Sequence, residues 1–151
     1  MIISDSTSLI ILFDLERLEL LSNIFKMIYI PKAVYEEISF KEDIMLPKFI
    51  KIIEVKNSEL LNSLKNLLDV GESEAIALAK MKNLPLIIDE KKGRKIAQNL
   101  DLKIIGLLGI VYLNVKSDLL SKDEAEKFLT TAVDNGYRIS KKLIDDMMES
   151  L

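Results

Sequence analysis

The chain has 151 residues, 49% of them hydrophobic and 30% charged, which fits one globular domain with its own core. It contains no histidine and no cysteine, which excludes zinc sites built on imidazole or thiolate, disulfides, and Ser-His or Cys-His nucleophiles. Any chemistry must come from carboxylates, hydroxyls, lysines and arginines. A bound metal would then be a hard cation held by oxygen, with magnesium or manganese as the leading candidates. The net charge of -3 argues against a broad nucleic-acid-binding surface but leaves room for a local basic patch.

The N-terminus opens on an apolar run without the basic region or cleavage site of a secretory signal. Charged residues interrupt every apolar run before it reaches the ~18 to 20 residues that span a bilayer. We therefore expect a cytoplasmic protein without membrane association.

The hydrophobic pattern predicts strands alternating with helices along the chain. In order, it predicts a strand at 1–4, two short helices or one kinked helix at 7–24, a strand at 27–30 stopped by Pro31, a helix at 32–40 and a strand at 52–55. It then predicts helices at 58–68 and 72–81 separated by Gly71, a strand at 84–88, a helix at 90–100, a strand at 102–105, and helices at 107–115, 122–133 and from 140.

This alternation favours a three-layer α/β/α sandwich with a mainly parallel central sheet, over a helical bundle or an antiparallel sandwich. No linker-like segment or internal repeat divides the chain, so residues 1–151 are expected to form a single domain.

Two aspartates, Asp5 and Asp89, each follow an apolar strand. Ligands of an open parallel sheet collect beyond the carboxyl ends of its strands, so these carboxylates share one edge if their strands are neighbours. Each also has a structural interpretation, because Asp5 suits an N-cap and Asp89 is placed to cap the helix that begins at Glu90.

Two glutamates extend this candidate site. Glu37 lies one turn after Ala33 and Val34, which predicts a place on the apolar face of its helix. Glu72 lies in the first turn of its helix, where backbone amides favour a negative charge. The neighbouring Glu36 and Glu74 lie about 100° and 200° around their helices, at ~3.6 residues per turn, so one of each pair faces the site.

Glu37 alone also fits a surface ion pair with Lys41, and Glu72 alone fits a helix-dipole partner. Together, however, four acids at one sheet edge repel one another, and a divalent cation relieves that repulsion. Such clusters support phosphoryl chemistry, in which the metal activates a water and stabilises charge on the phosphate oxygens.

A basic run, Lys91-Lys92-Gly93-Arg94-Lys95, follows Asp89. It is either a solvated first helical turn or a set of cations that meets nucleic-acid phosphates beside the acids. The segment Gly106-Leu107-Leu108-Gly109 lacks both the Gly-x-Gly-x-x-Gly order and a Walker lysine, so close backbone packing explains it better than phosphate binding.

These features resemble the PIN-domain family of metal-dependent nucleases, many of which are toxins of toxin–antitoxin pairs. The resemblance runs nearly end to end, and its sharpest segments are 3–10, 30–38, 71–79 and 88–97, with 106–110 as a further marker of one PIN subgroup.

The resemblance implies a Rossmann-like α/β/α sandwich with one or two magnesium or manganese ions and a water that attacks a phosphodiester. It implies that the metal ligands and catalytic residues are Asp5, Glu37, Glu72 and Asp89. Many PIN proteins also carry a hydroxyl residue two places before the last acid, where this chain has Ile87. Ser6 or Thr7 is an alternative source of that hydroxyl, and Lys91, Lys92 and Arg94 are candidate accessory residues.

The leading hypothesis is an endoribonuclease that cleaves RNA, the toxin of a pair whose small antitoxin inserts a segment into the acidic groove. A homodimer is expected by family analogy. The alternative is a catalytically degenerate PIN-like module that binds nucleic acid or protein. A haloacid-dehalogenase phosphatase, which needs a second acid where Thr7 stands, and a receiver domain fit the pattern less well.

Overall fold

Five short parallel strands form the central sheet in the order β3-β2-β1-β4-β5. The structure is a computed structural model that describes residues 1–40 and 43–151. The strands are β1 (Ile2–Ser4), β2 (Ile28–Pro31), β3 (Ile50–Ile53), β4 (Leu86–Ile87) and β5 (Ile104–Ile105). β1 lies at the centre and pairs in parallel with β2 on one side and β4 on the other. The carboxyl ends of all these strands therefore meet at one edge.

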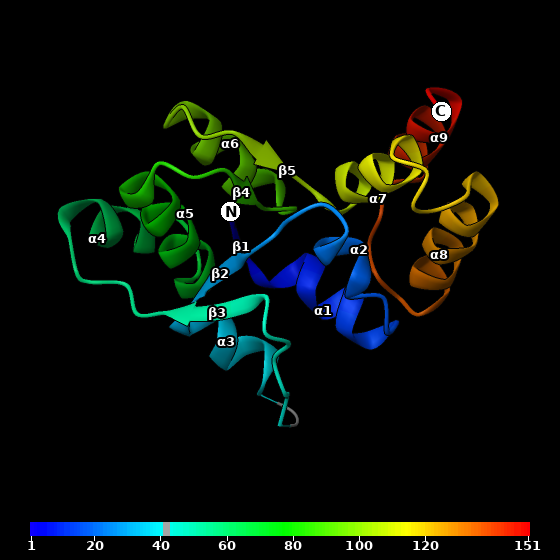
Figure 1. Cartoon of the computed structure of the whole chain (residues 1–151). Helices are drawn as coiled ribbons and strands as arrows, with labels where there is room; N and C mark the ends of the chain where they lie inside the picture. Colours follow the sequence, from blue (N-terminus) through cyan, green and yellow to red (C-terminus); the bar gives the residue numbers. More distant parts are fainter. Residues whose placement is uncertain (41–42) are drawn as a thin grey trace.

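Helices cover both faces of this sheet (Figure 1). Their bounds are α1 (Ser6–Asp14), α2 (Glu19–Ser22), α3 (Lys32–Ile38), α4 (Glu59–Lys65), α5 (Val70–Lys82), α6 (Lys91–Asn99), α7 (Leu107–Lys116), α8 (Lys122–Asp134) and α9 (Lys141–Glu149). None of the helices in the described part of the chain is long and apolar enough to span a membrane.

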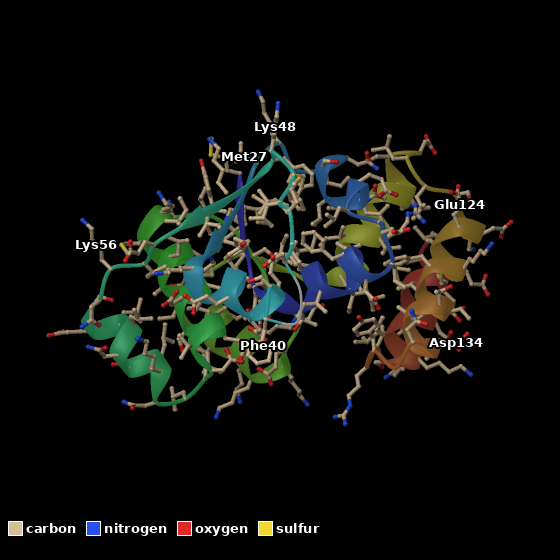
Figure 2. The ribbon with its side chains drawn as sticks, turned by 90° about the horizontal axis from the view of Figure 1, so that it is seen from below. Met27, Phe40, Lys48, Lys56, Glu124 and Asp134 are labelled. Atoms are coloured by element: carbon tan, nitrogen blue, oxygen red, sulfur yellow. The ribbon has the colours of Figure 1, made fainter. Side chains whose placement is uncertain are left out.

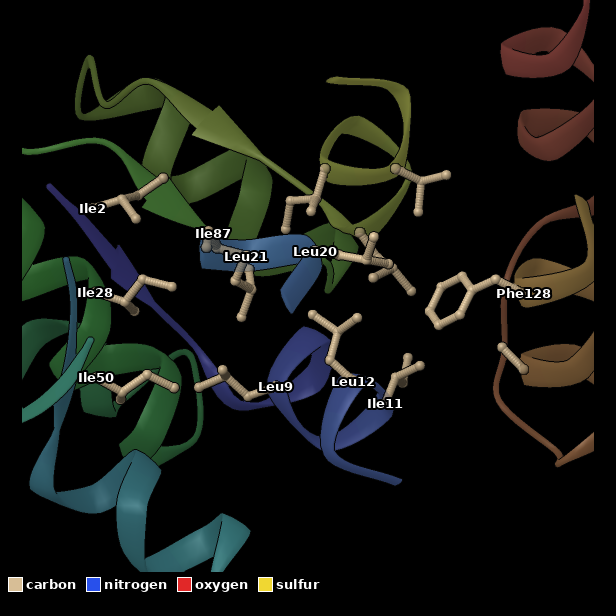
Figure 3. Close-up of a cluster of buried hydrophobic side chains, with 14 of the residues drawn as sticks. Ile2, Leu9, Ile11, Leu12, Leu20, Leu21, Ile28, Ile50, Ile87 and Phe128 are labelled. Atoms are coloured by element: carbon tan, nitrogen blue, oxygen red, sulfur yellow. The ribbon is translucent and has the colours of Figure 1, made fainter. Parts of the chain in front are cut away.

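Successive strand residues enter two different hydrophobic clusters, because side chains alternate across a sheet. One cluster contains Ile2, Ile28, Ile50 and Ile87 and packs against α1, α2, α7 and α8. The other contains Ile3, Leu86 and Ile88 and packs against α4, α5 and α6. Figure 3 shows the first cluster, with Phe128 reaching into it from α8. Charged side chains such as Lys48 and Lys56 point outward at the periphery (Figure 2).

The predicted α/β/α sandwich with a parallel sheet is confirmed, and segment 7–24 forms two helices, α1 and α2. Several boundaries differ from prediction. β3 begins at Ile50 rather than at 52, and β4 and β5 are shorter than the apolar runs that contain them. The prediction that Gly71 separates two helices is wrong, because Asp69 caps α5 by accepting a hydrogen bond from the Glu72 amide and Gly71 lies inside the first turn.

One buried polar residue, Asn114, ties α7 to α2. Its side chain is fully buried and donates to the carbonyls of Leu20 and Ile110, both at 2.8 Å. Its carbonyl oxygen accepts from Asn23 at 2.9 Å. Leu20 lies within α2, so the side-chain amide of Asn114 in α7 links these two helices on the first face of the sheet.

We predict that Asn114→Ala destabilises the fold by about 1 to 3 kcal/mol, because buried backbone carbonyls lose their donor and a small cavity forms. The midpoint of urea unfolding measures this loss. Asn62→Ala, at an exposed position of α4, is the control and is expected to change stability by less than about 0.5 kcal/mol. Equal midpoints for the two variants contradict the prediction.

Candidate metal centre

Asp5 follows β1 directly and stands at the N-cap position of α1, yet its side chain makes no capping hydrogen bond. The backbone amide of Asp5 donates to the carbonyl of Ile87, which carries the β1–β4 pairing one residue beyond the strands. The side chain is 3% exposed, and its Oδ1 has no hydrogen-bond partner among the described residues. The capping interpretation of this carboxylate therefore fails, and a buried acidic oxygen is left without a partner.

The surroundings of Asp5 make its ionised form costly. Burial raises the pKa of its carboxyl to about 7, although the neighbouring Ser6 amide partly offsets the shift. Repulsion from Asp69, Glu37 and Asp89 raises the pKa further. Glu37 and Asp89, two of the other acids predicted from the sequence, therefore lie close enough to Asp5 to disfavour its ionised form.

Glu72 is the second buried acid and lies in the first turn of α5. It is 8% exposed, and its Oε2 has no hydrogen-bond partner among the residues that the structure describes. Burial raises the pKa of Glu72 to about 8, with further increases from the neighbouring Asp69, Asp5 and Glu90. The side chain reaches α6, because a Cβ added at Gly93 would lie 3.0 Å from Glu72 Oε2.

Asp69 and Glu90 are acids of this site that the sequence reasoning missed. Asp69 caps α5, and Glu90 caps α6 by accepting from the Gly93 amide at 2.7 Å. That amide lowers the pKa of Glu90. A signal for Asp69 was present, because an N-cap residue followed three positions later by Glu, here Glu72, is the spacing of a capping box.

Glu37 is exposed on α3, so the prediction that it lies on the apolar face is wrong. The buried side of this short helix is set by Val34 and Ile38. Glu37 nevertheless turns toward α5, since a Cβ added at Gly71 would lie 3.0 Å from Glu37 Oε2. Its proposed partner Lys41 lies outside the described residues.

The two competing glutamates have other positions. Glu74 accepts a hydrogen bond from the Ala33 amide at 3.2 Å and so caps α3 from α5. Glu36 is exposed and has no side-chain hydrogen bond within the described part of the chain. Glu37 and Glu72 are therefore the members of each pair that face the other acids.

Asp89 is held by two donors at the end of β4. Its Oδ1 accepts from the Leu107 amide at 2.8 Å, and its Oδ2 accepts from the Ser8 hydroxyl. Asp89 does not cap α6, because Glu90 does. The carboxylate instead joins the N-terminus of α7 to that of α1 across the sheet edge.

The hydroxyl that contacts Asp89 belongs to Ser8, whereas the sequence analysis named Ser6 or Thr7 as the source of a hydroxyl. Ile87 is buried in the first hydrophobic cluster, and Thr7 is exposed. Ser8 is 1% exposed and lies three residues after Asp5, one turn along α1, which directs both side chains to the same edge. That spacing was the signal available in the sequence.

The donor set suits a hard cation. No group of three acidic side chains in residues 1–40 and 43–151 is already gathered closely enough to hold a metal ion. Asp5 Oδ1 and Glu72 Oε2 are nevertheless buried acceptors without donors, a costly arrangement that an oxygen-coordinated cation relieves. The exposed Glu37, whose side chain makes no hydrogen bond among the described residues, has rotamer freedom to complete such a site.

A family model described as PIN domain matches residues 1–151. The chain belongs to the PIN domain family. No curated protein and no solved structure matched it. In this PIN domain, Asp5 and Asp89 follow the neighbouring parallel strands β1 and β4, and the assignment of Asp5, Glu37, Glu72 and Asp89 as metal ligands stays a prediction.

Of the three accessory cations predicted from the sequence, Lys91 and Arg94 line a groove that begins at Asp89, and Lys92 does not. Arg94 donates from Nη1 to the Ile88 carbonyl at 2.9 Å. Asp89 Oδ1 and Arg94 Nη1 lie 2.7 and 2.8 Å from a Cβ added at Gly106, so the glycine leaves room for both groups beside it.

We predict that the metal-free PIN domain loses stability as the pH rises from about 5 to 8. Unfolded carboxyls ionise near pH 4, whereas folded Asp5 and Glu72 keep their protons to about pH 7 and 8, so the unfolded state is progressively favoured between these values. Urea midpoints measured in EDTA across this range test the direction.

Asp5→Asn removes one of these groups and is expected to flatten the pH dependence, whereas Asp123→Asn, at an exposed position of α8, leaves it unchanged. Manganese is expected to raise the midpoint more at pH 8 than at pH 5.5, because the ion competes with the protons. A midpoint that rises with pH in EDTA, and is unaffected by Asp5→Asn, contradicts this account.

We also predict that Ser8→Ala weakens manganese binding by about 10-fold or more, the usual effect of removing a hydrogen-bond partner of a metal ligand. Isothermal titration at pH 7.5 measures the affinity. Ser63→Ala, at an exposed position of α4, is the control. A larger effect of Thr7→Ala than of Ser8→Ala would show that Thr7 supplies the hydroxyl instead.

Proposed function

We propose that this PIN domain is a metal-dependent endoribonuclease that hydrolyses RNA phosphodiesters. The observation that carries the proposal is the pair of buried, unpartnered carboxylate oxygens on Asp5 and Glu72 at the carboxyl edge of the sheet. In this proposal Asp5, Glu37, Glu72 and Asp89 hold magnesium or manganese, ions that PIN domains commonly bind.

When bound, the metal would supply an activated water and stabilise the charge on the phosphate oxygens. The protein supplies position. The Ser8 hydroxyl and the Leu107 amide fix the orientation of Asp89, and Asp69 fixes the first turn of α5, which carries Glu72. The Arg94 guanidinium, anchored to the Ile88 carbonyl, would supply a positive charge to a phosphate bound next to Asp89.

Proton release is part of this function. Because the pKa values of Asp5 and Glu72 are raised to about 7 and 8, both acids are largely protonated in the metal-free site below those values. Metal binding must displace these protons. We therefore expect the rate of RNA cleavage to increase as the pH rises through about 7 and 8.

The choice of RNA, the role as a toxin and the small antitoxin partner rest on the family resemblance. A homodimer has the same basis. An antitoxin segment that enters the site would cover the acids and compete with the metal, which is how inhibition would follow from this geometry.

A catalytically degenerate module is the second candidate. It is favoured by Ile87, which replaces a hydroxyl, and by the spacing of the acids in the described residues, where no three are gathered around one point. Manganese binding discriminates between the candidates. Calorimetric titration with no heat of binding at pH 8 favours the degenerate module.

We predict that the full chain cleaves single-stranded RNA in the presence of manganese and that Asp5→Asn and Asp89→Asn each reduce the rate by about 100-fold or more, as loss of a metal ligand or of charge stabilisation in an active site does. Gel electrophoresis of a labelled RNA measures cleavage.

The matched control uses neighbouring glutamates of α3. Glu37→Gln is expected to lower the rate, whereas Glu36→Gln is expected to retain it, because only Glu37 turns toward α5. Equal cleavage by wild type, Asp5→Asn and Asp89→Asn, with manganese required in none of them, excludes the proposed site.

A further inference from the structure

A groove of ≈ 960 Å³ extends from Asp89 to one side of the candidate metal centre. Its lining residues come from α6, which we call one wall, from β5 with the start of α7, which we call the floor, and from the α8–α9 connection with the first turn of α9, which we call the other wall. Thr7 and Ile11 of α1 also line it. Figure 1 shows α6 and α9 on either side of β5 and α7. Asp89 is the one candidate metal ligand that lines it. A molecule in the groove therefore approaches the acids from the β5 side of the sheet.

The groove carries a concentration of positive charge in a chain whose net charge is -3. Its lining cations are Lys91, Arg94, Lys95 and Arg138. The first three come from α6, and Arg138 comes from the opposite wall, so the charges flank the groove from both sides. The ion pair recorded in the described part of the chain joins Arg17 to Glu19, which leaves all four cations without a carboxylate partner there.

The floor between these cations is aliphatic. It includes Ile104, Ile105, Leu108 and Ile139, with the exposed Leu143 at its edge. None of the described residues that line the groove is aromatic. A ligand that fits must therefore offer anionic groups at both rims and a less polar face between them, and it cannot depend on stacking against aromatic rings.

We propose that this groove binds one strand of RNA beside the cleavage point, with backbone phosphates on Lys91, Lys95 and Arg138 and with the bases over the aliphatic floor. The part of this inference that concerns RNA cleavage rests on the proposed function. Binding of the RNA strand in the groove requires no metal. Basic grooves that follow the backbone of a single strand bind in this way, with affinity that depends strongly on salt.

The two walls select a single strand. A volume of ≈ 960 Å³ lies near the upper limit of about 1,000 Å³ for small-ligand pockets, enough for a few nucleotides between walls. A double helix presents its phosphates on the outside and is contacted across its shallow minor groove, so its paired strands do not enter a walled groove. Because the floor lacks aromatic rings, base preference is expected to be weak.

The test measures binding of a fluorescein-labelled, mixed-sequence 12-nucleotide RNA to the full chain in EDTA, where metal-dependent cleavage is absent, by fluorescence anisotropy. Lys95→Gln and Arg138→Gln are each expected to weaken binding about 5-fold at low salt. Each is also expected to reduce the slope of log affinity against log salt by about 0.7, the value for one phosphate contact to a single strand. Lys56→Gln, an exposed lysine that Figure 2 shows at the periphery, is the control and is expected to change neither quantity.

The same RNA annealed to its complement is expected to bind at least 10-fold more weakly. Equal affinity for single strand and duplex overturns the inference, as does binding that Arg138→Gln and Lys95→Gln leave unchanged. If these variants lose binding but the wild type cleaves no RNA with manganese, the groove stands and the proposed nuclease activity fails. If cleavage is observed but both variants bind RNA normally, the nuclease stands and the groove fails.

Discussion

The main constraint on this structure is the free energy that it costs to bury the carboxyl groups of Asp5 and Glu72 near each other, with one oxygen of each unpaired among the described residues. Asp5 and Glu72 are buried, each has an oxygen without a partner among the described residues, and Asp69 raises the pKa of both. A fold of this size tolerates little such strain, because the net stability of a domain is only about 5 to 15 kcal/mol. An arrangement that costs stability and satisfies no structural need is best explained by a ligand, and oxygen donors of this kind suit a hard cation.

The sheet topology creates this cluster. β1 lies between β2 and β4, so Asp5 at the end of β1 has Asp89 beside it at the end of β4, and α5, which carries Glu72, packs against the same strands. Backbone amides at the starts of α5, α6 and α7 are occupied by Asp69, Glu90 and Asp89. Helix N-termini stabilise these three acids, whereas Asp5 and Glu72 have no such donor for their buried oxygens. The site therefore combines three carboxylates held by backbone amides with two whose buried oxygens lack such donors. The latter two would gain most from binding a metal ion.

Positive charge is placed next to this acidic site rather than inside it. Lys91, Arg94, Lys95 and Arg138 line the groove that begins at Asp89, and none of the other candidate metal ligands is among its described lining residues. In the proposed RNA complex, this separation would let the phosphates be held without neutralising the carboxylates that the proposed metal requires. It also reconciles a net negative chain with a nucleic-acid ligand, since local field and not net charge decides where an anion binds.

The sequence by itself determined the alternation of strands and helices, the parallel sheet, and the family, because hydrophobic period and segment spacing are local properties of the chain. It also marked Asp5 and Asp89, which end apolar strands. Only the tertiary structure decided which oxygens are left without donors, that Ser8 and the Leu107 amide hold Asp89, that Glu74 caps α3, and that Arg138 lines the same groove as the cations of α6. These facts join residues far apart in the sequence, and a hydrogen bond or a groove wall between distant elements is fixed by packing that no local pattern encodes.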